Sequence, residues 1–188
     1  NQLLENIMRL SVKENIVYLS ATPSVAMKKM VTLKLFRRYH NHDLLVPDVV
    51  VCITLTIYVK LMMFLRRYNN IMLFVPTIKL AKLFSILLSV PCIHSETERK
   101  EDVIEQFEKR KYKILVCTTI MERGVTFENV NICVLFAEHP VFTKASLIQI
   151  AGRVGRSSKY PTGEGLFLCR RKSKKVDECI QELQMMNA

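Results

Sequence analysis

The chain has 188 residues, of which 49% are hydrophobic and 24% are charged. This composition excludes a disordered chain and suits one globular domain of ordinary size, with room for a fragment of another. The 28 Lys and Arg residues outnumber the 17 Asp and Glu residues, and the net charge of +11 favours a polyanionic partner such as nucleic acid or an anionic membrane surface.

Short apolar runs alternate along the chain with segments of helical periodicity, which is typical of a parallel sheet with crossover helices. The predicted strands cover residues 16–20, 71–75, 92–94, 114–117, 132–136 and 165–169. The predicted helices cover residues 24–30, 58–68, 78–88, 99–111, 144–152 and 174–185. We therefore expect an α/β fold with a parallel sheet flanked by helices on both faces.

The weakly periodic region 32–49 contains RRYHNHD and a proline, and we expect it to be a linker. It separates residues 1–31, which are too few to fold alone, from a main domain of residues 50–188, which is close to the usual domain size. We expect the leading piece to be the tail of an earlier domain. No secretory signal is expected at residues 1–9.

The cysteine pattern argues against a metal site. The six cysteines contain no C-x-x-C pair and several lie in apolar runs, so we interpret them as reduced core residues of a cytoplasmic protein. Residues 49–65 are the one candidate for a membrane span. They contain Lys60 and fall short of the ~18 apolar residues that a span needs. We interpret them as a buried strand followed by a core helix.

Hydroxyl side chains follow several predicted strands. Ser20 and Thr22 lie in SATP, Thr77 in LFVPT, and Thr118 and Thr119 in ILVCTTIMERG. Each threonine could have a purely structural role as a helix N-cap, and the T-x-x-E spacing from Thr119 fits a capping box. However, ligands bind open parallel sheets at the carboxyl ends of the strands, where helix N-termini attract anions. These turns therefore also predict a phosphate-binding edge.

The segment QIAGRVGRS places Gln149, Arg153 and Arg156 at positions i, i+4 and i+7 of a predicted helix, on one face. Arginine binds phosphate oxygens two at a time and stabilises the charge that develops in phosphoryl transfer. Gly152 and Gly155 would let a nucleotide or another backbone come close. The alternative is a solvated basic helix end, because cations favour helix C-termini.

In order and approximate spacing, SATP, FVPT, TTxxxRG and QxxGRxGR resemble motifs III to VI of superfamily 2 helicases. The resemblance covers residues 20 to about 169. Within the superfamily, RYHNHDLLVP, IHSETERK, TTIMERGVTF and IAGRVGRS are most similar to the ComFA-type late-competence helicases, with the primosomal restart helicases next. Because that family has two RecA-like lobes with ATP between them, we expect residues 50–188 to be the second lobe and residues 1–31 the end of the first.

The resemblance implies roles for individual residues. Gln149, Arg153 and Arg156 would be catalytic, with the arginines contacting the γ-phosphate. Residues matching motifs III, V and VI would bind ATP or couple it to nucleic acid: Ser20, Thr22, Arg123, Gly124, Thr126, Gly152 and Gly155. Nucleic acid would be held by Thr77, His94, Ser95, Thr118 and Thr119. Many helicases have an aspartate at the position of Thr126, which leaves sugar recognition open.

The resemblance also implies an ATP- and Mg²⁺-dependent motor at the inner face of the membrane. It would move on single-stranded DNA during DNA uptake, with the first lobe and a membrane channel as partners and no small-molecule substrate except ATP. The chain has neither a G-x-x-x-x-G-K-[ST] loop nor a D-E-x-H pair, so the first lobe would hold most of the ATP and the Mg²⁺. We do not expect the isolated chain to hydrolyse ATP. The alternatives are a catalytically silent nucleic-acid-binding or assembly module and a replication-restart or RNA helicase.

Overall fold

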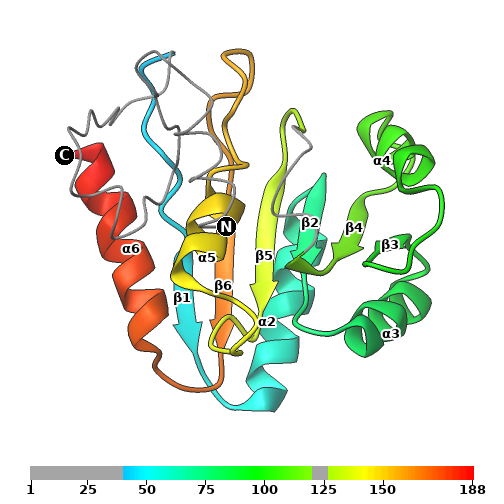
Figure 1. The fold of residues 1–188 in the computed structure, drawn as a ribbon, viewed down its shortest axis with the longest axis horizontal. Helices are drawn as coiled ribbons and strands as arrows, with labels where there is room; N and C mark the ends of the chain where they lie inside the picture. The colour runs from blue at the N-terminus through cyan, green and yellow to red at the C-terminus, as the bar shows by residue number, and fades with distance from the viewer. Residues whose placement is uncertain (1–39, 120–126) are drawn as a thin grey trace, which may run out of the picture. The chain divides into compact units, whose positions relative to one another are not determined.

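The computed structural model of the chain describes residues 40–119 and 127–188. They contain a sheet of six parallel strands in the order β1-β6-β5-β2-β4-β3 (Figure 1). The strands are β1 (Asp48–Val51), β2 (Ile71–Phe74), β3 (Cys92–Ile93), β4 (Ile114–Cys117), β5 (Asn131–Leu135) and β6 (Gly165–Cys169). The helices are α2 (Thr54–Arg67), α3 (Ile78–Leu88), α4 (Lys100–Glu108), α5 (Lys144–Ala151) and α6 (Lys174–Asn187). The expected parallel α/β sheet is confirmed.

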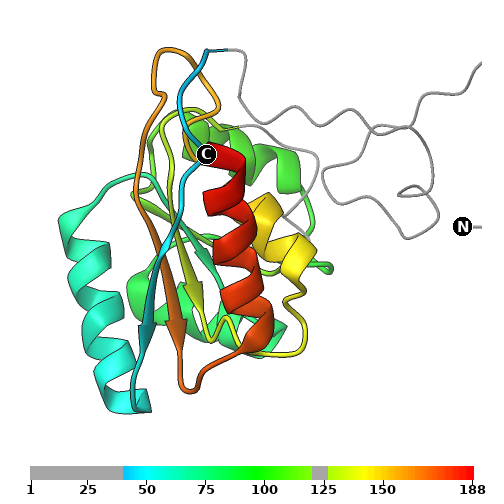
Figure 2. The same cartoon turned by 90° about the vertical axis from the view of Figure 1, so that its left-hand side faces the viewer.

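Helices cover both faces of the sheet, as expected. Helices α4, α5 and α6 pack on one face through a cluster that includes Phe107, Leu147 and Val176. Helices α2 and α3 pack on the other face through Ile57 and Phe84. Figure 2 shows α2 separated from α5 and α6 by the sheet. The central strands are thus buried on both faces, which explains why β2 and β4 are unbroken apolar runs in the sequence.

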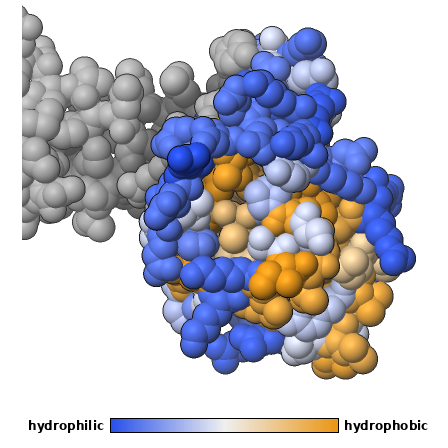
Figure 3. Space-filling model, turned by 90° about the vertical axis from the view of Figure 1, so that its right-hand side faces the viewer, coloured by the Kyte–Doolittle hydropathy of each residue, from blue (hydrophilic) through white to orange (hydrophobic). Residues whose placement is uncertain are grey.

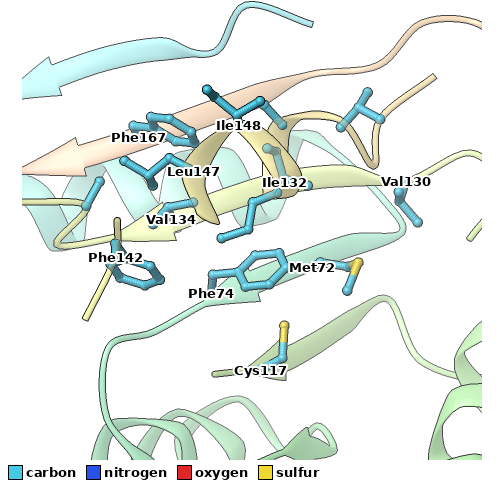
Figure 4. Close-up of a cluster of buried hydrophobic side chains, with 14 of the residues drawn as sticks. Met72, Phe74, Cys117, Val130, Ile132, Val134, Phe142, Leu147, Ile148 and Phe167 are labelled. Carbon is cyan, nitrogen blue, oxygen red and sulfur yellow. The ribbon is translucent and has the colours of Figure 1, made fainter. Parts of the chain in front are cut away.

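The core on the α5 side anchors the helix that leads into the segment 149–157. Alternate residues of β2 face opposite sides of the sheet, and Phe74 belongs to the core on this side while Leu73 belongs to the other. Leu147 of α5 lies next to Val134 of β5 and Phe167 of β6 (Figure 4), and all three side chains are fully buried. Packing of this kind holds the start of the segment in one position.

The boundaries of two helices, α2 and α4, differ from the expected ones by three residues or more at one end. Helix α2 begins at Thr54, ahead of the expected start at residue 58, because Ile57 and Leu61 share a face that is buried against the sheet. The β-branched residues of its first turn have low helix propensity, so the sequence pattern missed that turn. Helix α4 ends at Glu108, short of residue 111, and Arg110 adopts a left-handed conformation with φ of 58°. The predicted strand 16–20 and helix 24–30 lie outside the described residues.

The interpretation of residues 49–65 as a buried strand and a core helix is wrong in part. Strand β1 is at the edge of the sheet, and its side chains are mostly exposed. Helix α2 buries one face and leaves apolar side chains on the other in solvent. Within residues 40–119 and 127–188, every helix is too short or too polar to cross a membrane.

The described part of the expected linker packs on the domain. The backbone of Leu44 and the side chain of Asn187 exchange two hydrogen bonds, of 2.8 and 2.9 Å. Leu45 and Val46 pack against the core, and β1 begins at Asp48, before the expected domain start at residue 50. Residues 40–49 therefore belong to the fold of the domain, which their weak periodicity did not reveal. The boundary at residue 31 stays a prediction, because residues 1–39 lie outside the described part.

Gly165 lies beneath this packed segment. A Cβ atom at this position would lie 2.5 Å from Leu45 Cδ2 and 3.2 Å from both Ile132 Cγ1 and Pro47 Cβ. We expect Gly165→Val to lower the free energy of unfolding by about 3 kcal/mol, because overpacking a filled core forces its neighbours out of position. Urea unfolding followed by circular dichroism measures this change. A loss below about 1 kcal/mol would mean that the segment containing Leu45 and Pro47 moves aside easily.

Candidate functional site

The carboxyl ends of three neighbouring strands bring several candidate residues together. Strands β2, β4 and β3 are adjacent and parallel, so their last residues lie at one edge of the sheet. Thr77 comes after β2, His94 and Ser95 follow β3, and Thr118 and Thr119 follow β4. Segments far apart in the chain therefore form one polar edge.

Two threonines at this edge differ in exposure. Thr77 is exposed, and its Oγ1 accepts a hydrogen bond of 3.2 Å from Leu80 N, which makes it the N-cap of α3. The N–H of buried Thr118 donates to Ile93 O at 3.1 Å and ties β4 to β3. A hydroxyl that accepts one hydrogen bond can still donate one, so capping leaves Thr77 able to contact a phosphate oxygen.

The side chain of His94 is buried and holds a turn. Its backbone N–H donates to Thr97 Oγ1 at 2.8 Å, and its ring Nδ1 accepts from Glu96 N at 3.3 Å. These contacts match the structural role that is usual for a lone histidine. Ser95, next to it, is exposed at the edge. The turn therefore presents Ser95 to solvent and keeps His94 inside.

The expectation that Gln149, Arg153 and Arg156 share one face of a helix is wrong. Helix α5 begins with a capping box and ends at Ala151, so the two arginines lie in the turns that follow. Gly152 is the C-cap, and Gly155 has φ of 68°, which favours glycine. Both glycines therefore shape the end of the helix and the turn, and neither lies inside a helix.

The two arginines lie in different environments. Arg153 is 2% exposed, and its positive charge lowers the pKa of the Cys117 thiol, although burial raises that pKa more strongly. The guanidinium is therefore close to the end of β4. Arg156 is exposed, and its Nε donates to Gly152 O at 3.0 Å. Of the two, Arg156 is the one that lies on the surface of this domain.

Gln149 carries a buried polar atom close to these turns. Its Oε1 accepts no hydrogen bond from the described residues. A buried amide oxygen without a donor costs roughly 1–3 kcal/mol. Natural proteins concentrate such costs at functional sites, so this atom marks the C-terminal part of α5 as a place where a donor could bind.

His40 is a site neighbour that the sequence analysis missed. Its Nε2 lies 3.0 Å from Gly155 O, which connects the beginning of the described chain to the turn that carries Arg156. The two residues are 115 positions apart, and His40 lies in the region expected to be a linker. No signal in the sequence pairs them, because the contact depends on how residues 40–47 pack on the domain.

An ion pair between a buried carboxylate and an exposed arginine, which was also missed, shapes the turn before α5. Glu138 Oε1 accepts from Arg170 Nε at 2.8 Å, and the Glu138 side chain is 2% exposed. The Arg170 guanidinium stacks over the Phe136 ring at 4.7 Å. Burial and the nearby Glu138 charge raise the pKa of the Cys169 thiol to about 12. The pair joins the ends of β5 and β6 and so holds the turn that leads into α5.

Five predicted site residues lie outside the described part of the chain: Ser20, Thr22, Arg123, Gly124 and Thr126. Their proposed contacts with ATP stay predictions. Among residues 40–119 and 127–188, no three His, Cys, Asp or Glu side chains form a group suited to a metal ion.

Comparison with known sequences identifies relatives of the chain. The sequence model of the helicase conserved C-terminal domain matches residues 54–158. Competence protein ComFA of Streptococcus pneumoniae is 33% identical over the whole chain, and ComFA of Bacillus subtilis is 29% identical. The chain covers 49% and 46% of those two proteins, so it spans about half the length of the curated relatives it matches.

Comparison with solved structures finds the same fold. S. cerevisiae Dbp5 bound to RNA and ADP BeF3 matches with a TM-score of 0.69 and 18% identity, over 100% of this chain and 53% of that one. The C-terminal domain of the DEAD-box protein Dbp5 matches with a TM-score of 0.56 and 17% identity, over 76% of this chain and 85% of that one. At these identities the likeness concerns the fold, which is that of a RecA-like helicase C-terminal domain.

Proposed function

Because the chain belongs to the helicase conserved C-terminal domain family and is homologous to the ComFA competence helicases, we propose that it is the second lobe of a DNA-uptake motor. The parent protein would hydrolyse ATP and move on single-stranded DNA. The first lobe would hold most of the ATP and the Mg²⁺. A location at the inner face of the membrane and a DNA-uptake channel as partner are part of this proposal and rest on the homology.

The exposure of Arg156 is the observation that carries the proposal. The Arg156 side chain lies on the surface after α5, and its bond to Gly152 O orients the plane of the guanidinium. A guanidinium oriented in advance loses less conformational entropy when it binds phosphate oxygens. Arg156 would therefore stabilise the charge that develops on the γ-phosphate when the two lobes close, and the amide of Gln149 would orient groups beside it.

Arg153 would couple the nucleotide to the nucleic acid. Arg153 is buried in the domain, and its charge lowers the pKa of the Cys117 thiol at the end of β4, directly before Thr118. A shift of the turn that carries Arg153 and Arg156 would therefore move the start of the Thr118–Thr119 segment. Arg153 is in this account a positioning residue, whereas Arg156 contacts the substrate.

The polar edge would hold the nucleic-acid backbone. Thr77, Ser95, Thr118 and Thr119 lie at adjacent strand ends, where their hydroxyl groups would donate to phosphate oxygens. Phosphate contacts carry no direct base information, so binding would weaken with salt to a similar extent for any base composition.

The direct test is ATP hydrolysis by the full-length parent, measured without nucleic acid and with single-stranded DNA or RNA of the same length. We expect strong stimulation by DNA and weaker stimulation by RNA. Equal or stronger stimulation by RNA would instead identify an RNA helicase.

The second candidate is a nucleic-acid-binding or assembly module without turnover. The burial of Arg153 favours it, because one of the two arginines of the motif does not lie on the surface of this domain. Under this candidate the parent binds DNA and shows no DNA-dependent ATP hydrolysis, so the same assay separates the two functions.

A further inference from the structure

The surface of α2 and α3 carries exposed apolar side chains that the proposed function does not use. We refer to these side chains as the α2–α3 surface: Leu55, Val59, Met62, Met63, Leu83, Ile86 and Leu87. Leu55 is 74% exposed and Ile86 is 77% exposed. Figure 3, which views the molecule from the side of α3, shows apolar side chains in the middle of this face and out to its lower right edge, with hydrophilic side chains above them and to the left. Soluble domains rarely leave such a surface open unless it binds something.

The two helices are neighbours on the sheet and meet through one pair of aromatic rings. The rings of Tyr58 on α2 and Phe84 on α3 are 6.4 Å apart, and both helices pack on the same face of the sheet. The exposed apolar residues of α2 share one face of that helix, and those of α3 share one face of theirs. Apolar stripes on two neighbouring helices offer the kind of surface against which the apolar face of a third helix can pack.

Cationic side chains border this surface. Neither α2 nor α3 contains an acidic residue, and α2 carries Lys60, Arg66 and Arg67. Lys82 on α3 is paired with Glu96 at 3.4 Å. Among the described residues, the side chains of Lys60, Arg66 and Arg67 form no ion pair. These three cations are therefore available to carboxylates of a partner.

A hollow at the end of α2 joins the apolar and cationic features. Its volume is about 510 Å³, and its lining includes Met63 and Leu166 together with the three cations of α2. Asp48 and Glu164 also line it, so the cations exceed the carboxylates by one, three against two. A carboxylate that projects from an apolar helix face would fit this hollow in shape and in charge.

We propose that the α2–α3 surface docks an amphipathic helix of a protein partner, with acidic residues flanking the apolar face of that helix. A flat bilayer surface would leave the hollow unfilled. The phosphates that dominate nucleic-acid binding would not cover Leu55 or Ile86. The hollow also lies at the edge where β1 and β6 begin, opposite to the strand ends proposed to hold DNA. This inference does not depend on the proposed catalytic roles.

The test measures peptide binding to the 188-residue chain by fluorescence anisotropy. The probe is a labelled amphipathic peptide of about 20 residues, long enough to form a helix, with leucine on one face and glutamate elsewhere. A second peptide carries lysine in place of glutamate, and a third has the first composition in scrambled order. We expect the acidic amphipathic peptide to bind with a Kd on the order of 10 µM and the other two to bind at least tenfold more weakly.

Charge-reversal variants locate the binding surface. Met63→Glu and Arg67→Glu should each weaken binding of the acidic peptide about tenfold, by placing a carboxylate where the peptide carries leucine or glutamate. Met185→Glu is the matched control, because Met185 is 65% exposed on α6, on the other face of the sheet, and Met63 is 59% exposed. Circular dichroism verifies that all three variants fold.

Four results would overturn the proposal. The first is equal binding of the three peptides, and the second is that Met185→Glu weakens binding as much as Met63→Glu does. The third is that the chain binds anionic phosphatidylglycerol vesicles and not the acidic peptide, and that Met63→Glu abolishes the vesicle binding. The fourth is dimerisation in analytical ultracentrifugation that Met63→Glu abolishes, which would identify a second copy of the chain as the occupant.

Discussion

Replacing Arg156 by alanine in the full-length parent is expected to lower DNA-stimulated ATP turnover by roughly 10³-fold or more, the effect typical of a lost arginine finger. The side chain is exposed and oriented by Gly152 O, so it can reach a nucleotide held by another lobe. Its removal should destabilise the transition state of ATP hydrolysis and should not affect the contacts with bound DNA. Steady-state hydrolysis measures the loss, and DNA binding measured in parallel should stay close to that of the unmodified parent.

Two variants control this experiment. Arg156→Lys keeps the charge and loses the planar fork, so it should recover little of the activity. Lys159→Ala removes a neighbouring exposed cation, which lies 5.7 Å from the Tyr160 ring, and should leave turnover unchanged. If Arg156→Ala keeps more than about a tenth of the turnover, less than 1.4 kcal/mol of transition-state stabilisation is lost, and Arg156 is not an arginine finger.

Replacing Arg153 by alanine is expected to act on stability first. Arg153 is 2% exposed and is among the largest fully buried side chains of the domain. Its removal leaves a cavity and takes a buried charge from its partners, so we expect a loss of about 3–5 kcal/mol in the free energy of unfolding. Urea unfolding of the 188-residue chain measures this loss. Arg156→Ala, at an exposed position, should change stability by less than about 0.5 kcal/mol.

The comparison of Arg153 with Arg156 tests the division of roles between them. If Arg153→Ala is as stable as Arg156→Ala, the buried arginine does not hold the turn, and its positioning role fails. Arg153→Lys, which keeps the positive charge near Cys117, serves for assays of the parent if the alanine variant does not fold. It should reduce the stimulation by DNA more than the turnover without DNA, because its proposed role is to connect the two sites.

Local patterns predicted most of the sheet and its helices. The strand Ile114–Cys117 and the helix Ile78–Leu88 match their predictions residue for residue, because a buried apolar run and a capped amphipathic segment are signals that neighbouring residues carry. The start of α2 and the role of residues 40–49 were not predictable in this way. Both depend on what the segment packs against, and weakly periodic residues carry no sign of that partner.

For the candidate site, the residue types and their order along the chain were sufficient to identify the family and to nominate the strand-end threonines and the two arginines. The fold then decided what each residue can do. It ended α5 at Ala151, buried Arg153 and left Arg156 in solvent. It also brought His40 to Gly155 across 115 positions. Periodicity describes neighbours along a single element, whereas burial and long-range contacts arise only when elements pack, and that packing separated two arginines that look equivalent in the sequence.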